Sequence, residues 1–114
     1  MKQQNISEND WCDFIEHFSR DHAGQRVTIE LLDPQLGPQK MAQDLPLQGI
    51  SFDTAGTRPS SLEISAGESP QQHVRHVIDK PMYISVARDD QNREIALQIE
   101  PADGAKTLLH LSAQ

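Results

Sequence analysis

The chain has few of the residues from which many functional motifs are built. Among its 114 residues it contains one cysteine, one tryptophan, one tyrosine and three phenylalanines. A single cysteine, Cys12, excludes an intramolecular disulfide and fits a reducing compartment. No apolar run approaches the roughly 20 residues that a membrane helix needs, and the polar N-terminus lacks the apolar stretch of a secretory signal. We therefore expect a cytoplasmic protein that has no membrane as a partner.

Positive charge is also scarce. Ten basic residues face seventeen acidic ones, which gives a formal net charge of -7. Such a surface repels phosphate backbones and anionic lipid, so nucleic acid and anionic membranes are not expected as partners. Proteins that bind RNA through a sheet interleave basic and aromatic residues, and here Tyr83 is the only aromatic residue on an expected exposed strand face.

The length allows one domain with one core. Hydrophobic residues make up 36% of the chain, which predicts a thin core, but their periodicity argues against wholesale disorder. We expect residues 1–114 to form a single domain, with residues 1–6 as a disordered tail.

One helix is predicted between Ser7 and Gly24. Ser7 and Asp10 have the spacing of a capping box, with Asp in place of the usual Glu, and Gly24 is a plausible stop. Apolar residues recur at the spacing of a single helical face. They are Trp11, Phe14, Ile15 and Phe18.

After Gly24 the apolar period changes from 3.6 to 2, which predicts about six short strands. The segment 34–44 is predicted to be a loop, with Gly37 and Pro38 as its turn signal, and residues 54–60 a turn. Residues 73–79 fit either a strand or a single helical turn that ends at Lys80, since Pro81 follows. The six predicted strands are 26–33, 45–53, 62–66, 82–86, 95–99 and 107–111.

This order of elements predicts an α+β fold. Because no crossover helices separate the strands, the sheet should be a mostly antiparallel meander with the N-terminal amphipathic helix packed on its apolar face. The alternative for the same strands is a partly open small barrel, which would protect the sheet edges. The inner face is expected to comprise Val27, Ile29, Ile84, Leu97 and Ile99.

The segment 45–53 contains a fault in its alternation. Leu45 and Leu47 share one parity, whereas Ile50 and Phe52 share the other, and Gly49 stands between the pairs. One extra residue resets the alternation, so a β-bulge at Gly49 would place all four side chains on the core face.

The sharpest candidate site is formed by His73, His76 and Asp79. In a helix these residues would lie along one side, and two imidazoles with a carboxylate form a feasible set of ligands for zinc or iron. In a strand His73 and His76 would point to opposite faces and the set would fail. A structural role, as surface or hydrogen-bonded histidines, is the alternative reading of the same residues.

Other candidate chemistry is weaker. Cys12 lies near the helix start, where amide dipoles can activate a thiol, but its acidic neighbours favour the neutral thiol. Cys12 also lies next to the buried face, where a cysteine usually acts as a small hydrophobe, so we expect a structural role. His17 is too far from Cys12 for direct contact, and a pairing of His22 with Asp21 has no further support. Asp89 and Asp90 fit a solvated hairpin tip. Nucleophile-elbow, P-loop and dinucleotide motifs are missing, so we predict no catalytic residue and no cofactor.

Three segments in this order resemble a family of short bacterial proteins catalogued only as a domain of unknown function. They are Trp11-x-x-Phe14 leading to Phe18-Ser19, then Leu45-x-Leu47-x-Gly49-Ile50-Ser51-Phe52-Asp53, then His76-x-Ile78-x-x-Pro81 with a following strand and the Asp103-Gly104 hairpin. The resemblance implies a stand-alone cytosolic bacterial protein. It supplies no agreed activity, so no catalytic residue is carried over, but it draws attention to Trp11, Gly49, His76 and Pro81.

Two functions remain open. The first is a non-enzymatic protein-binding or accessory module that contacts an unknown protein or forms a homodimer through an open sheet edge. The second is a small-ligand or metal-binding protein, an enzyme included, that uses His73, His76 and Asp79.

Overall fold

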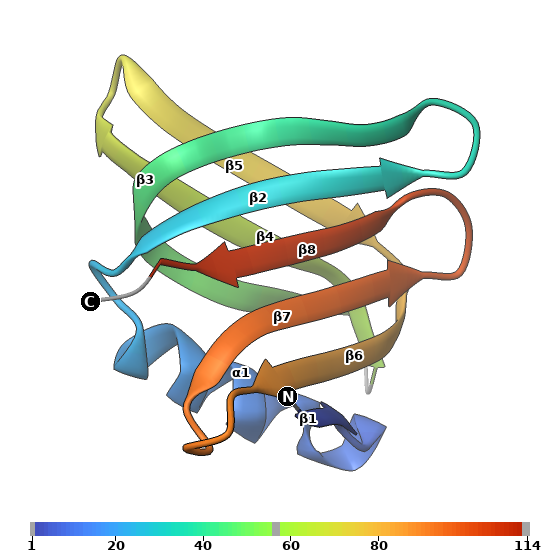
Figure 1. Cartoon of the computed structure of the whole chain (residues 1–114). Coiled ribbons are helices and arrows are strands. Elements are labelled where there is room, and N and C mark those ends of the chain that lie inside the picture. Colours follow the sequence, from blue (N-terminus) through green and yellow to red (C-terminus); the bar gives the residue numbers. More distant parts are fainter. Residues whose placement is uncertain (1, 56–57, 113–114) are drawn as a thin grey trace.

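The computed structural model describes residues 2–55 and 58–112 (Figure 1). Within them, antiparallel strands form one strongly curled sheet, and a short helix lies across the lower end of that sheet. The elements are β1 (Lys2–Asn5), the 3-10 helix η1 (Glu8–Asp10), α1 (Trp11–Asp21), β2 (Arg26–Asp33), β3 (Gly37–Ala55), β4 (Arg58–Ser69), β5 (Gln72–Asp79), β6 (Pro81–Arg88), β7 (Glu94–Pro101) and β8 (Lys106–Leu111).

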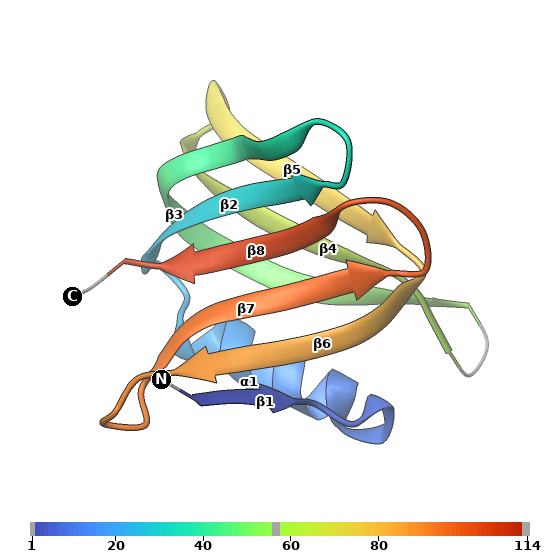
Figure 2. The same ribbon diagram turned by 45° about the vertical axis from the view of Figure 1, so that its right-hand side comes forward.

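The sheet has eight strands in the order β1-β6-β7-β8-β2-β3-β4-β5. Two meanders, β2–β5 and β6–β8, are joined by the pairing of β8 with β2. The two outermost strands, β1 and β5, do not pair with each other, so the curled sheet is not closed into a barrel (Figure 2). The antiparallel sheet is confirmed, but the fold is dominated by the sheet rather than clearly α+β.

The helix is shorter than predicted. It begins at Trp11 after the 3-10 turn, and neither Ser7 nor Asp10 makes a side-chain cap hydrogen bond, so the predicted capping box is wrong. Gly24 has a φ of 84° and donates its N–H to the carbonyl oxygen of Leu47. The chain therefore leaves the helix directly towards β3.

The predicted loop over residues 34–44 is wrong, because β3 already begins at Gly37. The Asp33 carboxylate accepts hydrogen bonds from the backbone N–H groups of Gln35 and Leu36, which closes a tight turn at residues 34–36. Those two N–H groups also hold the pKa of Asp33 below its ordinary value. Most of residues 37–42 are exposed, and this part of β3 is held by its ladder with β2.

The predicted bulge is confirmed. The register between β3 and β4 shifts between Leu47 and Gly49. As a result Leu47 and Ile50, which have opposite parity in the sequence, are 2% and 5% exposed, and Leu45 and Phe52 pack against the same core.

Two further segments are strands. Residues 73–79, for which the sequence allows a strand or a helical turn, lie in β5. Lys2–Asn5, expected from their polarity to be a disordered tail, form β1 and pair with β6. Backbone hydrogen bonds to β6 hold β1 in place. The N–H of Ile6 continues this ladder by donating to the carbonyl oxygen of Ile84. The expected turn at 54–60 is wrong for its described residues, because 54–55 belong to β3 and 58–60 to β4. Residues 56 and 57 lie outside the described residues.

The core fills the concave side of the sheet. Trp11, Ile15 and Phe18 of α1 enter it, whereas Phe14 is only partly buried. The predicted inner-face residues are all buried, at 1% exposure or less: Val27, Ile29, Ile84, Leu97 and Ile99.

Candidate functional site

The three residues of the predicted metal site lie on β5, and the structure does not bring them together. His73 and Asp79 are exposed on the outer face of the sheet, whereas His76 is half-buried and turned towards the interior. Alternation of side chains along a strand is the cause. In residues 2–55 and 58–112, no group of three or more His, Cys, Asp and Glu side chains is arranged to hold a metal ion.

His76 instead forms a pair with a residue of β8. Its Nε2 lies 3.0 Å from the hydroxyl Oγ1 of Thr107. Burial lowers the pKa of His76, which favours the neutral ring. An imidazole next to a hydroxyl is the arrangement of a general base and its nucleophile, but Thr107 is 0% exposed. That hydroxyl is therefore closed to any substrate in this conformation.

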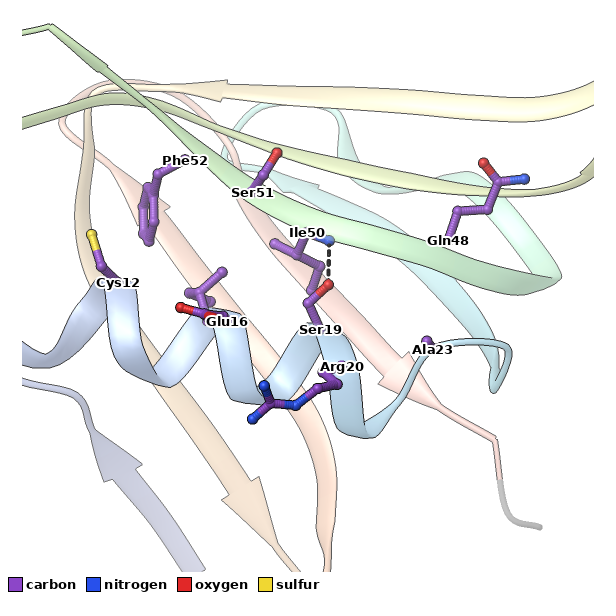
Figure 3. A pocket seen from close by; sticks show the side chains of 10 residues that line it. Cys12, Glu16, Ser19, Arg20, Ala23, Gln48, Ile50, Ser51 and Phe52 are labelled. Carbon is purple, nitrogen blue, oxygen red and sulfur yellow. Dashed lines mark hydrogen bonds between the residues drawn. The ribbon is translucent and has the colours of Figure 1, made fainter.

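A groove on the surface lies between α1 and β3 (Figure 3). Its volume is about 450 Å³. Ile15, Ile50 and Phe52 supply apolar surface. The Ser19 hydroxyl accepts a hydrogen bond of 2.9 Å from the backbone N–H of Ile50, which fixes the helix against the bulged part of β3.

Cys12 lies in this groove and is exposed, so the expectation that it packs as a small hydrophobe is wrong. Glu16 and Arg20 line the same groove, and no histidine does. A thiol needs an adjacent base or a clearly electropositive setting to become a nucleophile. The groove therefore offers apolar contact beside an exposed thiol.

A polar cluster fastens the end of α1 to the sheet. The two ring nitrogens of His22 lie 2.7 Å from Oε1 of Gln25 and 2.8 Å from Oε1 of Glu94. Gln25 also donates from Nε2 to the carbonyl oxygen of Ser112. Sequence reasoning missed this cluster, because His22 and Glu94 are 72 positions apart and neither belongs to a motif. The polar groups of this cluster hydrogen-bond to one another, which indicates that the cluster stabilises the contact between α1 and the sheet.

The hairpin between β6 and β7 behaves as predicted. The Asp89 carboxylate accepts hydrogen bonds from the backbone N–H groups of Gln91 and Arg93 and from the Arg93 side chain. The backbone N–H of Arg93 is the main cause that lowers the pKa of Asp89. Asp89 thus shapes the turn.

The remaining feature is the free edge of β5. β5 is eight residues long, and no strand of the described part of the chain pairs with its outer edge. The outer face of β5 presents His73, Arg75, Val77 and Asp79, all exposed, with Val77 at 43%. Arg75 forms an ion pair with Glu63 of β4. The other edge strand, β1, has only four residues.

Comparisons with known proteins give one match. Searches of curated proteins and of solved structures each found none. In the described residues, no helix has the length and hydropathy needed to cross a membrane. A family model described as a family of unknown function (DUF5335) matches residues 2–114, which confirms the resemblance drawn from the sequence motifs.

Proposed function

We propose that this chain, which belongs to DUF5335, a family of unknown function, is a non-enzymatic protein-binding module that takes an extended segment of its partner along the outer edge of β5. The family supplies no activity, so the proposal rests on the geometry of the sheet. An added strand would continue the ladder that ends at β5.

The free edge of β5 carries this proposal. An edge strand presents unpaired N–H and C=O groups, which proteins usually shield with short strands, proline, lysine or bulges. β5 carries the charged residues Arg75 and Asp79 but contains neither Lys nor Pro. Its register with β4 runs without a shift from Gly67 opposite His73 to Ser61 opposite Asp79. This regular edge is a suitable template for strand addition.

The titratable groups support a role without catalysis. In the part of the chain that the structure describes, the pKa clearly departs from its ordinary value at Arg26, Asp33, His76 and Asp89. Hydrogen bonds within the fold account for the two aspartates, an ion pair with Glu68 for Arg26, and burial for His76. Catalytic groups are typically perturbed inside an open cleft. None of these four lines the groove between α1 and β3, and Asp89, which lines a second pocket beside His22 and Glu94, is hydrogen-bonded within its own turn.

A phage-displayed library of random peptides tests the proposal. Selected peptides should shift the backbone amide NMR signals of β5 and β4. Val77→Lys should lose most of their binding, because lysine at an edge disfavours strand addition. The matched control Val77→Thr keeps a β-branched side chain and should bind normally. Peptides that shift only the groove between α1 and β3, or a library that yields no binder, would overturn the proposal.

A second candidate is small-ligand binding in the groove between α1 and β3, which the apolar surface of Ile15, Ile50 and Phe52 favours.

The metal-binding alternative would require His73, His76 and Asp79 to turn to one side of β5. Two measurements test the metal-binding alternative. One is elemental analysis of protein purified without chelator or affinity tag, and the other is the shift in melting temperature when zinc or iron is added. Bound metal or a clear stabilisation by either ion would support this alternative.

A further inference from the structure

We propose that the strand added to β5 is β5 of a second copy of this chain, paired antiparallel about a two-fold axis that lies midway between the two Val77 residues. This inference rests on the proposed function, because it names the occupant of the same edge. The edge is self-complementary in this arrangement, because basic and acidic side chains share the outer face of β5.

The faces of the sheet restrict the possible registers. In a sheet that continues from one copy into the other, the outer faces coincide, and directly opposed residues lie on the same face. Outer residues therefore oppose outer residues. Along β5 these are His73, Arg75, Val77 and Asp79, a sequence that ends in an acidic group and has basic groups before it. An antiparallel copy reverses that order and brings unlike charges together.

The register centred on Val77 is the most favourable. It places Arg75 of each copy opposite Asp79 of the other, so two ion pairs form, and it places the two half-exposed Val77 side chains against each other. On the inner face it sets His76 opposite Ile78 of the second copy.

Neighbouring registers are poorer. A centre at Arg75 would oppose two guanidinium groups, and like charges directly opposite are destabilising. A centre at His76 would pair His73 with Asp79 of the second copy but would set Arg75 against an apolar Val77. It would also face the two half-buried His76 rings with each other. Of these three registers, only the one centred on Val77 combines two ion pairs between permanently charged side chains with an apolar contact.

The local charges are compatible with this arrangement. Arg75 already contacts Glu63, and a guanidinium has five N–H donors, enough for a second carboxylate. Two chains that each carry a net charge of -7 repel one another, but at 0.15 M salt the screening length of about 8 Å favours contacts between close neighbours. We therefore expect a weak, concentration-dependent dimer.

Charge-reversal variants test the register. In Asp79→Arg, the arginine introduced at position 79 of each copy would face Arg75 of the other. In Arg75→Glu, a glutamate would face Asp79. Each variant alone should associate at least tenfold more weakly than the natural sequence. In an equimolar mixture every pair is again of opposite charge, so a heterodimer should form with near-natural affinity.

Sedimentation equilibrium from 10 µM to 1 mM at 0.15 M salt would measure these affinities, roughly spanning the range of weak association. The natural sequence should approach twice the chain mass of 12.8 kDa. A monomer at all concentrations, or a mixture that fails to associate while both variants retain natural circular dichroism and melting temperature, would overturn the proposal.

Two further measurements separate the alternatives. His73→Gln should leave dimerisation unchanged. If this variant no longer dimerises, the register is the one centred on His76, and the register centred on Val77 is overturned. If the natural chain is monomeric while library peptides still bind along β5, self-pairing is wrong and the proposed function stands. If peptides do not bind along β5, the proposed function itself fails.

Discussion

His76 and Thr107 are hydrogen-bonded across the interior of the curled sheet, with 3.0 Å between Nε2 and Oγ1, although they are 31 positions apart in the chain. The bond joins β5, at the free edge of the sheet, to β8 in its middle. This hydrogen bond therefore helps to fix the position of β5, the edge strand proposed to bind a partner.

The stability of the fold should depend on the charge of His76. Because burial lowers its pKa from 6.5, the folded state favours the neutral ring. This contribution is complete above pH 6.5 and is lost as the pH falls through the lower pKa of the folded state. Urea unfolding at pH 8 and pH 5.5 should show a smaller free energy of unfolding at pH 5.5, and His76→Gln should reduce that difference. His17→Gln, at an exposed histidine, should leave it unchanged; equal effects of both variants would contradict the prediction.

Removal of the Trp11 side chain should be costly. Trp11 is 3% exposed, its ring stacks on Phe52 at a centroid distance of 6.0 Å, and its indole N–H donates to the carbonyl oxygen of Ile6. Trp11→Ala should lower the free energy of unfolding by roughly 3–5 kcal/mol. Circular dichroism is the appropriate probe, since Trp11 is the only tryptophan. Natural stability in this variant would show that α1 can detach from the sheet.

The Ser19 hydroxyl satisfies the backbone N–H of Ile50. Ser19→Ala would leave that partly buried N–H without a partner, so we expect a loss of roughly 1–3 kcal/mol in chemical unfolding. Cys12→Ser, at an exposed position of the same helix, serves as the control and should change stability by less than about 0.5 kcal/mol. A Ser19→Ala variant as stable as this control would mean that water replaces the hydroxyl.

Gly67 and Gly49 should respond differently to alanine. A Cβ at Gly67 would lie 2.7 Å from Cα of His73 and would also collide with the carbonyl oxygen of Gln72, whereas a Cβ at Gly49 would meet only Oγ of Ser19, at 3.5 Å. Gly67→Ala should therefore lower the melting temperature markedly, at a cost of about 1–3 kcal/mol, and Gly49→Ala much less. The reverse order would show that the β4–β5 hairpin yields easily.

Much of the sheet could be predicted because its strands carry a strict period of 2. Residues 26–31 and 95–99 alternate cleanly, and both segments are strands in the structure. The bulge beside Gly49 could also be predicted, because a strand whose apolar residues change parity can bury all of them on one face only by inserting a residue. Local patterns of this kind survive folding because each strand buries one face.

The rest depends on contacts that leave no local pattern. β1 is polar and the first part of β3 is mostly exposed. Both are held by backbone ladders, which carry no hydrophobic signature. The partners His22 and Glu94, and likewise His76 and Thr107, are distant in sequence. Lys80, expected to be extended before Pro81, has a φ of 51°, because its N–H and C=O are bound to Ser60 and Ala102.

The pairing of β2 with β8 has a consequence for how the chain folds. It joins Val27 to Leu111 and Leu32 to Lys106, so the two meanders become one sheet only through contacts between opposite ends of the sequence. Closing so long a loop costs entropy before any contact rewards it, which slows folding. During synthesis, β2 must wait with an open edge until β8 leaves the ribosome, and this interval is when the nascent chain is most exposed to aggregation.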